Sequence, residues 1–413
     1  MRLALNLFFI LCGVSFSGTA YSEATRDYTQ YVDPFIGTGG HGHVFLGASV
    51  PFGAVQLGPN NFFQGWDWCS GYHYSDNVVL GFSHLHLSGT GIPDLGDILI
   101  MPYSGEVMTS AGKRTEPGSG YATRYSHDDE TARPGYYAVE LPAYGISVEL
   151  TSTERVGVHR YRFSDRKPSR IIIDLEHENG EGRAVQTAIR QVDDYTLNGY
   201  RFSTGWARDQ RVYFTFKSSV PIASFQVFDG DRDLYSTEGE GRGLKGVITF
   251  SSNPDEVMLK VGISPVSEEN ALNNIEAETP DWDFDKIVEQ ARDKWNDELQ
   301  KIRVKTSDDA SKRVFYTALY HTMIAPVLFN DHDGDYRGAD KEVYESAPFS
   351  NYSIFSLWDT YRATHPLFTL TQPERVNDFV KSMLAIFEQQ RRLPVWHLLD
   401  NETDTMLAIT PYL

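Results

Sequence analysis

The segment Asp33–Asp97 concentrates residue types that bind sugars. It holds many glycines, five histidines and several carboxylates, together with aromatic side chains that include Trp66, Trp68, Tyr72 and Tyr74. Flat aromatic faces suit a sugar ring, glycines let the backbone approach a ligand, and polar groups bind hydroxyls. The segment therefore predicts a carbohydrate site. The alternative is a glycine-rich hairpin whose aromatic residues fill a core.

Two later segments combine tryptophan with charged side chains. SLWDTYRATHP places a ring platform, a hydrogen-bond acceptor and a forked donor within about one turn, at Trp358, Asp359 and Arg362. RRLPVWHLLDNETD groups acids and amides near a tryptophan and includes Asn401 and Glu402. Both segments fit a sugar cleft. The alternatives are an Asp cap with a surface Arg in the first, and a helix cap in the second.

Two residue patterns resemble metal-binding sites but match such sites incompletely. Asp331, Asp333 and Asp335 follow the spacing of a calcium loop, yet Tyr336 stands where that loop needs glycine, which favours an acidic, solvent-facing hairpin. The histidines, His86 among them, form two i, i+2 pairs but lack the accompanying ligands of a zinc site. Sugar hydrogen bonding or core packing suits these histidines better.

The net charge limits the partners that the protein can have, and the N-terminal residues indicate its location. The 413 residues include 37 Lys and Arg against 56 Asp and Glu, a formal charge of −19 that disfavours nucleic acid and anionic membranes. Residues 1–22 have the charged start, apolar run and small residues of a signal peptide, so we expect a secreted or periplasmic protein. No later run is long enough to span a membrane, and the remaining Cys69 should be a buried thiol.

The hydrophobic pattern changes from strands to helices along the chain. Short β-branched and aromatic runs between about 136 and 264 predict an antiparallel β-sandwich over 23–270. A helical linker is expected over 271–305, with an amphipathic helix opening near Thr279. Further helices should follow within 306–413. The inward faces expected for them include Val314 in one helix and, in another, Val380, Leu384 and Phe387.

Several long segments, in this order, resemble glycoside hydrolase family 92, the calcium-dependent exo-acting α-mannosidases of bacteria. They include DPFIGTGGHGHVFLGASVPFGAVQLGP, GWDWCSGYHYSD, GFSHLHLSGTG, GYRFSTGWARDQRVYF, SLWDTYRATHPLFTLTQPERVNDFV and RLPVWHLLDNETD. The resemblance implies a multidomain β-then-α protein. Its N-terminal β-sandwich, helical linker and (α/α)6 barrel would form a cleft where the domains meet, and mannose-containing glycans would bind there.

The resemblance also assigns roles. Trp66 would contact the leaving-group side, while the pocket for the mannose to be cleaved would be formed by Trp358, Asp359, Asn401 and Glu402, with Arg362 and His86 as further candidates. The family inverts, using a Glu acid, an Asp base and Ca²⁺, whose ligands are not identifiable in this chain. The EGNAW-like and GNDDCGQ-like segments that carry the acid and base do not occur. We therefore expect a truncated barrel at 306–413 and a catalytic pair beyond Leu413. A non-catalytic carbohydrate-binding protein is the alternative.

Overall fold

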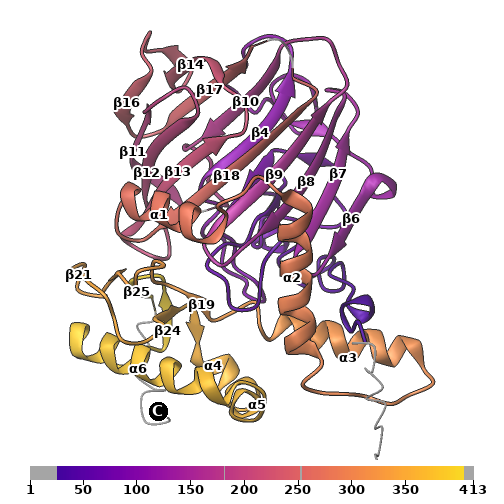
Figure 1. The fold of residues 1–413 in the computed structure, drawn as a ribbon, viewed down its shortest axis with the longest axis vertical. Coiled ribbons are helices and arrows are strands. Elements are labelled where there is room, and N and C mark those ends of the chain that lie inside the picture. The colour runs from indigo at the N-terminus through magenta and orange to yellow at the C-terminus, as the bar shows by residue number, and fades with distance from the viewer. Residues whose placement is uncertain (1–25, 181, 252–253, 404–413) are drawn as a thin grey trace, which may run out of the picture.

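The chain folds into a β-rich module followed by a helical region (Figure 1). The computed structural model describes residues 26–180, 182–251 and 254–403. Within these ranges the long strands lie before residue 265 and the α-helices lie after it. The predicted change from β to α is confirmed. The expected signal peptide lies outside the described residues.

Two antiparallel sheets form the β module. In spatial order the seven-stranded sheet consists of β1 (Gly58–Asn60), β3 (Gly81–Ser83), β4 (Leu99–Ser104), β10 (Ser169–Asp174), β17 (Leu244–Phe250), β14 (Ile222–Asp229) and β15 (Arg232–Asp233). The nine-stranded sheet consists of β16 (Glu238–Gly241), β11 (Arg183–Gln191), β12 (Thr196–Thr204), β13 (Gln210–Ser218), β18 (Glu256–Ser264), β9 (Val156–Phe163), β8 (Ile146–Ser152), β7 (Tyr136–Leu141) and β6 (Glu130–Arg133).

One hydrophobic core joins the two sheets. Val148 and Leu150 alternate along β8 and are buried, with Ile171 and Val247 from the other sheet in the same core. Each such side chain contributes about 1.5–3 kcal/mol on burial, so the alternation alone holds the layers together. The predicted antiparallel sandwich is thereby confirmed. Cys69 is buried, as expected.

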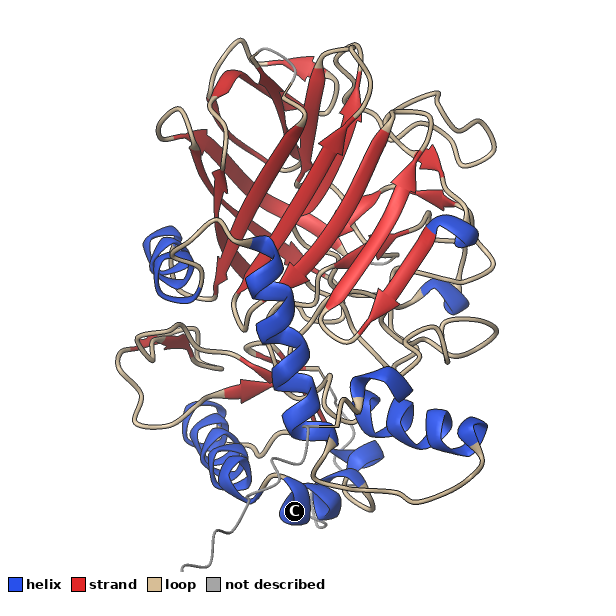
Figure 2. Cartoon of the chain, turned by 45° about the vertical axis from the view of Figure 1, so that its right-hand side comes forward, coloured by secondary structure: helices blue, strands red, loops and turns tan. Residues whose placement is uncertain are grey.

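Two helices follow the sandwich, and the second of them runs from it to the helical region (Figure 2). The first, α1 (Glu268–Glu278), packs against β18 and β13; a Cβ on Gly262 would lie 2.2 Å from the Ala271 carbonyl oxygen, so this approach requires glycine. The next, α2 (Phe284–Leu299), is capped by the Asp283 carboxylate, which accepts from the Lys286 amide. Its Trp295 indole donates to the Ser49 carbonyl at 2.6 Å, tying the helix to the N-terminal segment.

The helical region contains α3 (Asp309–His321), α4 (Leu357–Thr360), α5 (Thr364–Thr371) and α6 (Pro373–Gln390). Two short strand pairs also belong to this part of the chain: β19 (Val327–Leu328) with β22 (Tyr352–Ser353), and β20 (Tyr336–Arg337) with β21 (Val343–Tyr344). A third short pair, β2 (Val78–Val79) with β5 (Thr123–Arg124), belongs to the N-terminal part. A three-stranded sheet joins β23 (Phe355–Ser356), β24 (Trp396–Leu398) and β25 (Asn401–Glu402). None of the helices in the described ranges is long and apolar enough to cross a membrane.

The two parts share a second core. Phe52 from the N-terminal segment lies 5.5 Å from Phe368 of α5 and 5.9 Å from Phe379 of α6, measured between ring centroids. The ring therefore anchors both helices to the sandwich. Domain boundaries stay predictions, although α1 begins at Glu268, just before the linker predicted at 271.

Two predicted helix faces are wrong in part, because Leu319 of α3 and Phe379 of α6 are buried as the pattern predicts but other members are not. Val314 is 60% exposed, because α3 turns Tyr316 and Tyr320 inward. On α6 the buried side chains include Phe379 and Ile386, whereas the exposed ones include Val380, Leu384 and Phe387. A helix with apolar residues around much of its circumference does not indicate from its sequence which side meets the core.

Candidate active site

A cleft of about 270 Å³ lies where the sandwich meets the helical region. The sandwich contributes the loop Leu87–Thr90. The opposite wall comes from the helical region, where the polar and aromatic lining includes His321, Asp359, Thr360, His365 and Trp396. Acidic, hydroxyl, imidazole and aromatic groups therefore face one space, which suits a polyhydroxylated ligand.

Close backbone packing shapes the sandwich wall. Gly89 has φ +76°, a conformation that favours glycine, and its amide donates to the His43 carbonyl at 2.8 Å. Gly91 follows, and a Cβ placed on it would lie only 2.5 Å from Trp66 Nε1. The loop that lines the cleft therefore continues directly under the Trp66 indole.

Trp66 is a solvent-facing ring held from the side. It is 57% exposed, and the His43 ring meets it edge-on at 4.1 Å between centroids. The neighbouring Asp67 carboxylate pairs with His41 Nδ1 at 2.6 Å, and this hydrogen bond lowers the pKa of Asp67. Burial lowers the pKa of His43, which keeps its imidazole neutral against the indole. The loop thus presents an aromatic platform beside a carboxylate.

A buried carboxylate supports the base of this aromatic loop. Glu130 accepts from the Tyr72 hydroxyl at 3.0 Å, the Tyr137 hydroxyl at 2.7 Å and His127 Nδ1 at 2.7 Å. Burial raises the pKa of both tyrosines, so the phenols remain protonated donors. Three donors to one buried carboxylate fix β6, β7 and the loop relative to one another.

Of the three residues predicted in SLWDTYRATHP, the structure brings Asp359 to the cleft, together with Ser356, Thr360, Thr364 and His365 of the same segment. Its carboxylate lines the wall and accepts a hydrogen bond from the Ser356 hydroxyl. Trp358 precedes it on α4 and is 40% exposed, but it is not among the lining residues. Arg362 is also outside the lining and donates to the Tyr361 hydroxyl at 2.7 Å.

Asn401 and Glu402 lie behind the cleft wall. Both carboxylate oxygens of Glu402 accept backbone hydrogen bonds at 2.9 Å, from the amides of Val395 and Trp396. Asn401 is buried and donates through Nδ2 to the Asp209 carbonyl at 2.9 Å. These contacts hold the strand that carries Trp396, so in this structure the two residues support the wall.

His86 is buried and fully bonded. Its Nδ1 lies 2.8 Å from the Gln56 carbonyl oxygen and its Nε2 lies 3.1 Å from Asn60 Oδ1. Burial lowers its pKa to about 4. The ring is outside the lining of the cleft, and its contacts fit the core-packing alternative.

Two histidines that were not predicted as site residues line the cleft, although His365 lies within the SLWDTYRATHP segment. Burial lowers the pKa of His321 to about 4 and also lowers that of His365. Within the described ranges, His321 Nε2 is buried without a hydrogen-bond partner. His321 ends α3 and His365 stands in the first turn of α5, positions that become neighbours only through packing. Trp396, by contrast, is indicated as a site residue by the acidic residues that follow it in the sequence.

The acidic segment forms the predicted hairpin through β20 and β21, and Asp333 faces solvent, but Asp331 does not. Asp331 is buried, and its carboxylate accepts from the Ser264 hydroxyl at 2.6 Å and from Asn274 Nδ2 at 2.8 Å. Burial raises its pKa to about 7. The residues that the structure describes contain no group of three or more His, Cys, Asp or Glu able to hold a metal ion. Asp331 therefore joins the sandwich to the linker helix.

An antiparallel sandwich thus shares an aromatic and acidic cleft with a helical region, an arrangement that suits a carbohydrate ligand. Residues 31–264 match the glycosyl hydrolase family 92 N-terminal domain, and residues 270–410 match the glycosyl hydrolase family 92 catalytic domain. The chain therefore belongs to glycosyl hydrolase family 92.

Solved structures and a curated relative agree. A family 92 α-mannosidase of Bacteroides thetaiotaomicron in complex with mannoimidazole is 38% identical with a TM-score of 0.89, over 92% of this chain and 51% of that one. An inverting family 92 mannosidase of the same organism is 25% identical with a TM-score of 0.79, over 91% and 50%. A secreted glycosidase of Arthroderma benhamiae, itself uncharacterized, is 29% identical over 81% of this chain and 45% of its own length. The chain thus spans about half the length of these relatives.

Proposed function

We propose that the protein takes part in the hydrolysis of terminal α-linked mannose from glycans, with inversion at the anomeric carbon. The observation that carries this proposal is the cleft between the sandwich and the helical region, in a chain 38% identical to a mannosidase bound to mannoimidazole. The predicted signal peptide and the relative described as secreted support action in the periplasm or outside the cell.

The proposed roles follow the placement of the side chains. Trp66 receives the leaving-group sugar on its exposed face, while Asp359 and Trp396 contact the mannose to be cleaved. Trp358 and Arg362, on the same turn as Asp359, reach longer substrates. Glu402, with Asn401 beside it, positions Trp396 through the backbone amides that it binds.

We infer that the acid and base are not among residues 1–413. Inversion needs two carboxyl groups about 6.5–9.5 Å apart with a water between them. Asp359 is the acidic side chain that the described cleft contains, and the segments typical of the family's acid and base are missing from the sequence. This chain accordingly supplies binding groups and no general acid.

Calcium is implied by the family, but the described residues do not fit it. Asp331 is the best candidate by spacing, but its carboxylate oxygens already accept hydrogen bonds from Ser264 and Asn274. Six to eight oxygen ligands are required, and the described part of the chain brings together no such set. No step of the proposal passes through calcium.

The test compares residues 1–413 with the full product of the gene that encodes them on the methyl α-glycoside of α-1,2-linked mannobiose, whose hydrolysis frees only the cleaved mannose as a reducing sugar. Proton NMR follows the anomers, and an inverting enzyme releases β-mannose first. We expect this product from the natural protein, and binding without release from residues 1–413. Initial α-mannose would contradict inversion, and mannose released by residues 1–413 would contradict the missing acid and base. Trp66→Ala should weaken binding about three- to tenfold without changing the melting temperature.

The alternative is a non-catalytic carbohydrate-binding protein. The same aromatic and polar groups would serve it. Mannobiose binding by the natural protein, with no mannose released over a day, would favour this alternative.

A further inference from the structure

A second groove lies at the junction of the nine-stranded sheet with the linker helices. Its volume is about 410 Å³, and its lining includes Tyr195, Lys217, Lys260, Glu276 and Trp282. It shares no lining residue with the cleft. Strand β18, the end of α1 and the connection from α1 to α2 all contribute, so rigid elements form its walls.

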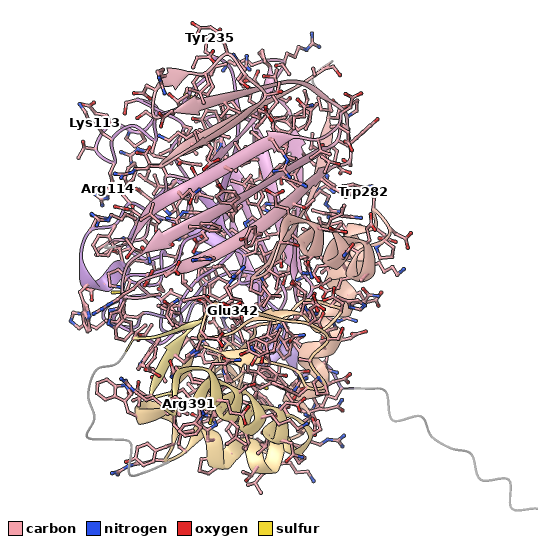
Figure 3. The ribbon with its side chains drawn as sticks, turned by 90° about the vertical axis from the view of Figure 1, so that its left-hand side faces the viewer. Lys113, Arg114, Tyr235, Trp282, Glu342 and Arg391 are labelled. Carbon is pink, nitrogen blue, oxygen red and sulfur yellow. The ribbon has the colours of Figure 1, made fainter. Side chains whose placement is uncertain are left out.

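Two aromatic rings in this groove face solvent. Trp282 is 39% exposed and Tyr195 is 45% exposed. Trp282 stands just before Asp283, the cap of α2, where an apolar side chain commonly packs back onto the helix. In Figure 3 its side chain instead projects at the edge of the molecule. A large ring left open beside a polar groove is a typical stacking surface for a sugar.

The floor of the groove holds a cation that lacks a carboxylate partner. Lys260 is 3% exposed; its Nζ donates to the Thr279 carbonyl and lies 4.1 Å from the centre of the Trp282 ring. Burial, with Lys217 nearby, lowers its pKa to about 8. An ammonium has three N–H donors, and within the described ranges Lys260 makes no ion pair. The Thr279 carbonyl takes one of these donors and the ammonium covers one face of the Trp282 ring, so the opposite face stays open.

The charge around the groove selects a neutral ligand. Glu276 pairs with Lys217 at 3.7 Å, so one of the two cations is already compensated. Asp281, a further acid, also acts on Lys260. The whole chain carries a formal charge of −19, which repels an anion.

We propose that this groove is a second glycan-binding site, which holds a neutral pyranose unit of a polysaccharide away from the cleft. The sugar ring stacks on Tyr195 and on the face of Trp282 that Lys260 leaves open, and Lys217 and Glu276 in the lining supply polar partners for its hydroxyl groups. The site retains a long glycan while its end reaches the cleft. Only the choice of mannose as the sugar rests on the proposed function.

The test measures binding of residues 1–413 to yeast α-mannan by affinity gel electrophoresis, with dextran and a soluble β-glucan as further neutral polysaccharides. Trp282→Ala and Tyr195→Ala should each weaken mannan binding at least fivefold. The matched control is Tyr235→Ala, because Tyr235 is a 93% exposed aromatic far from Trp282 in Figure 3 and should bind like the wild type. Melting temperatures establish that each variant is folded.

The outcomes separate this site from the cleft. Unchanged mannan binding by folded Trp282→Ala and Tyr195→Ala, with binding lost in Trp66→Ala, would overturn the groove and leave the proposed function standing. Binding of dextran or β-glucan that depends on Trp282, without mannan binding, would support the groove and contradict mannose as the substrate. Failure of all three polysaccharides to bind would overturn the groove. If Trp282→Ala fails to fold, mannan binding by Tyr195→Ala and by Lys217→Ala is compared with that of the wild type, and unchanged binding by both would overturn the groove.

Discussion

Replacing Arg201 should destabilise the sandwich more than any surface charge would. Its side chain is 2% exposed and forms an ion pair with Asp97, whose carboxylate is inaccessible to solvent. The guanidinium also donates to the carbonyls of Leu175 at 3.1 Å and His177 at 2.8 Å. It thus joins β12 to the segment that follows the cleft loop. In Arg201→Met the methionine fills the volume, but the buried carboxylate keeps only one strong partner, Gln210 at 2.6 Å.

The expected loss follows from the uncompensated charge. Breaking one side of a buried ion pair costs about 3–5 kcal/mol, because the remaining carboxylate is desolvated without its counter-ion. For a module of this size each kcal/mol lowers the melting temperature by about 2–4 °C, so the melting temperature should fall by roughly 6–20 °C. Arg201→Met with Asp97→Asn should lose less, since the unpaired charge is gone.

Differential scanning calorimetry at pH 7 measures this change. The control is Arg232→Met, because Arg232 pairs with Asp229 on the surface with 73% of its side chain exposed, and its loss should cost less than about 1 kcal/mol. A decrease below about 2 °C for Arg201→Met, or an equal decrease for the double variant, would refute the reasoning.

Three further predictions concern the cleft and the pH dependence. Gly91→Ala should push the Trp66 indole aside, because the new Cβ would lie 2.5 Å from Nε1; mannobiose affinity, measured by calorimetric titration, should fall about fivefold with the melting temperature kept. His84 and His159 are fully buried with their Nε2 atoms 3.0 Å apart, and burial lowers the pKa of His84 to about 4. The unfolded chain then binds more protons, so stability should fall as the pH drops from about 6.5 to 4, and a flat melting profile would contradict this. Asp331 affects the stability in the opposite direction, because its pKa is raised to about 7 and the folded state binds the proton more tightly than the unfolded chain. The stability that this proton contributes should be lost as the pH rises from about 4 to 7, and Asp331→Asn should remove that part of the melting profile.

The strands that the sequence predicts best are those with one buried face. Along β7, β8 and β9, β-branched and aromatic residues alternate with polar ones, and the strands appear where the pattern places them. Two long strands carry no such signal. β11 is mostly polar because it lies toward the sheet edge, and β12 contains Gly199, whose missing side chain makes room for Phe214. The helix α1 is weakly apolar and is marked mainly by its Ser267 cap.

The site is harder to predict than the strands, because distant segments form it. A tryptophan next to an acid pointed to Asp359, and glycine-rich sequence pointed to the Trp66 loop. Nothing local marks His321, whose ring reaches the cleft only because α3 docks beneath the sandwich. For the same reason spacing could not show that Glu402 turns its oxygens toward backbone amides.

The cleft walls come from segments separated by more than two hundred residues, Leu87–Thr90 on one side and Ser356 to Trp396 on the other. A ligand that touches both walls acts as a removable cross-link, because its binding free energy is lost if either part unfolds. Saturating ligand should therefore merge the melting of the sandwich and of the helical region into one transition, and a ligand at 100 times its Kd would add about 2.7 kcal/mol to both. A bound ligand would thus stabilise the fold in the same way as a direct contact between the two parts of the chain.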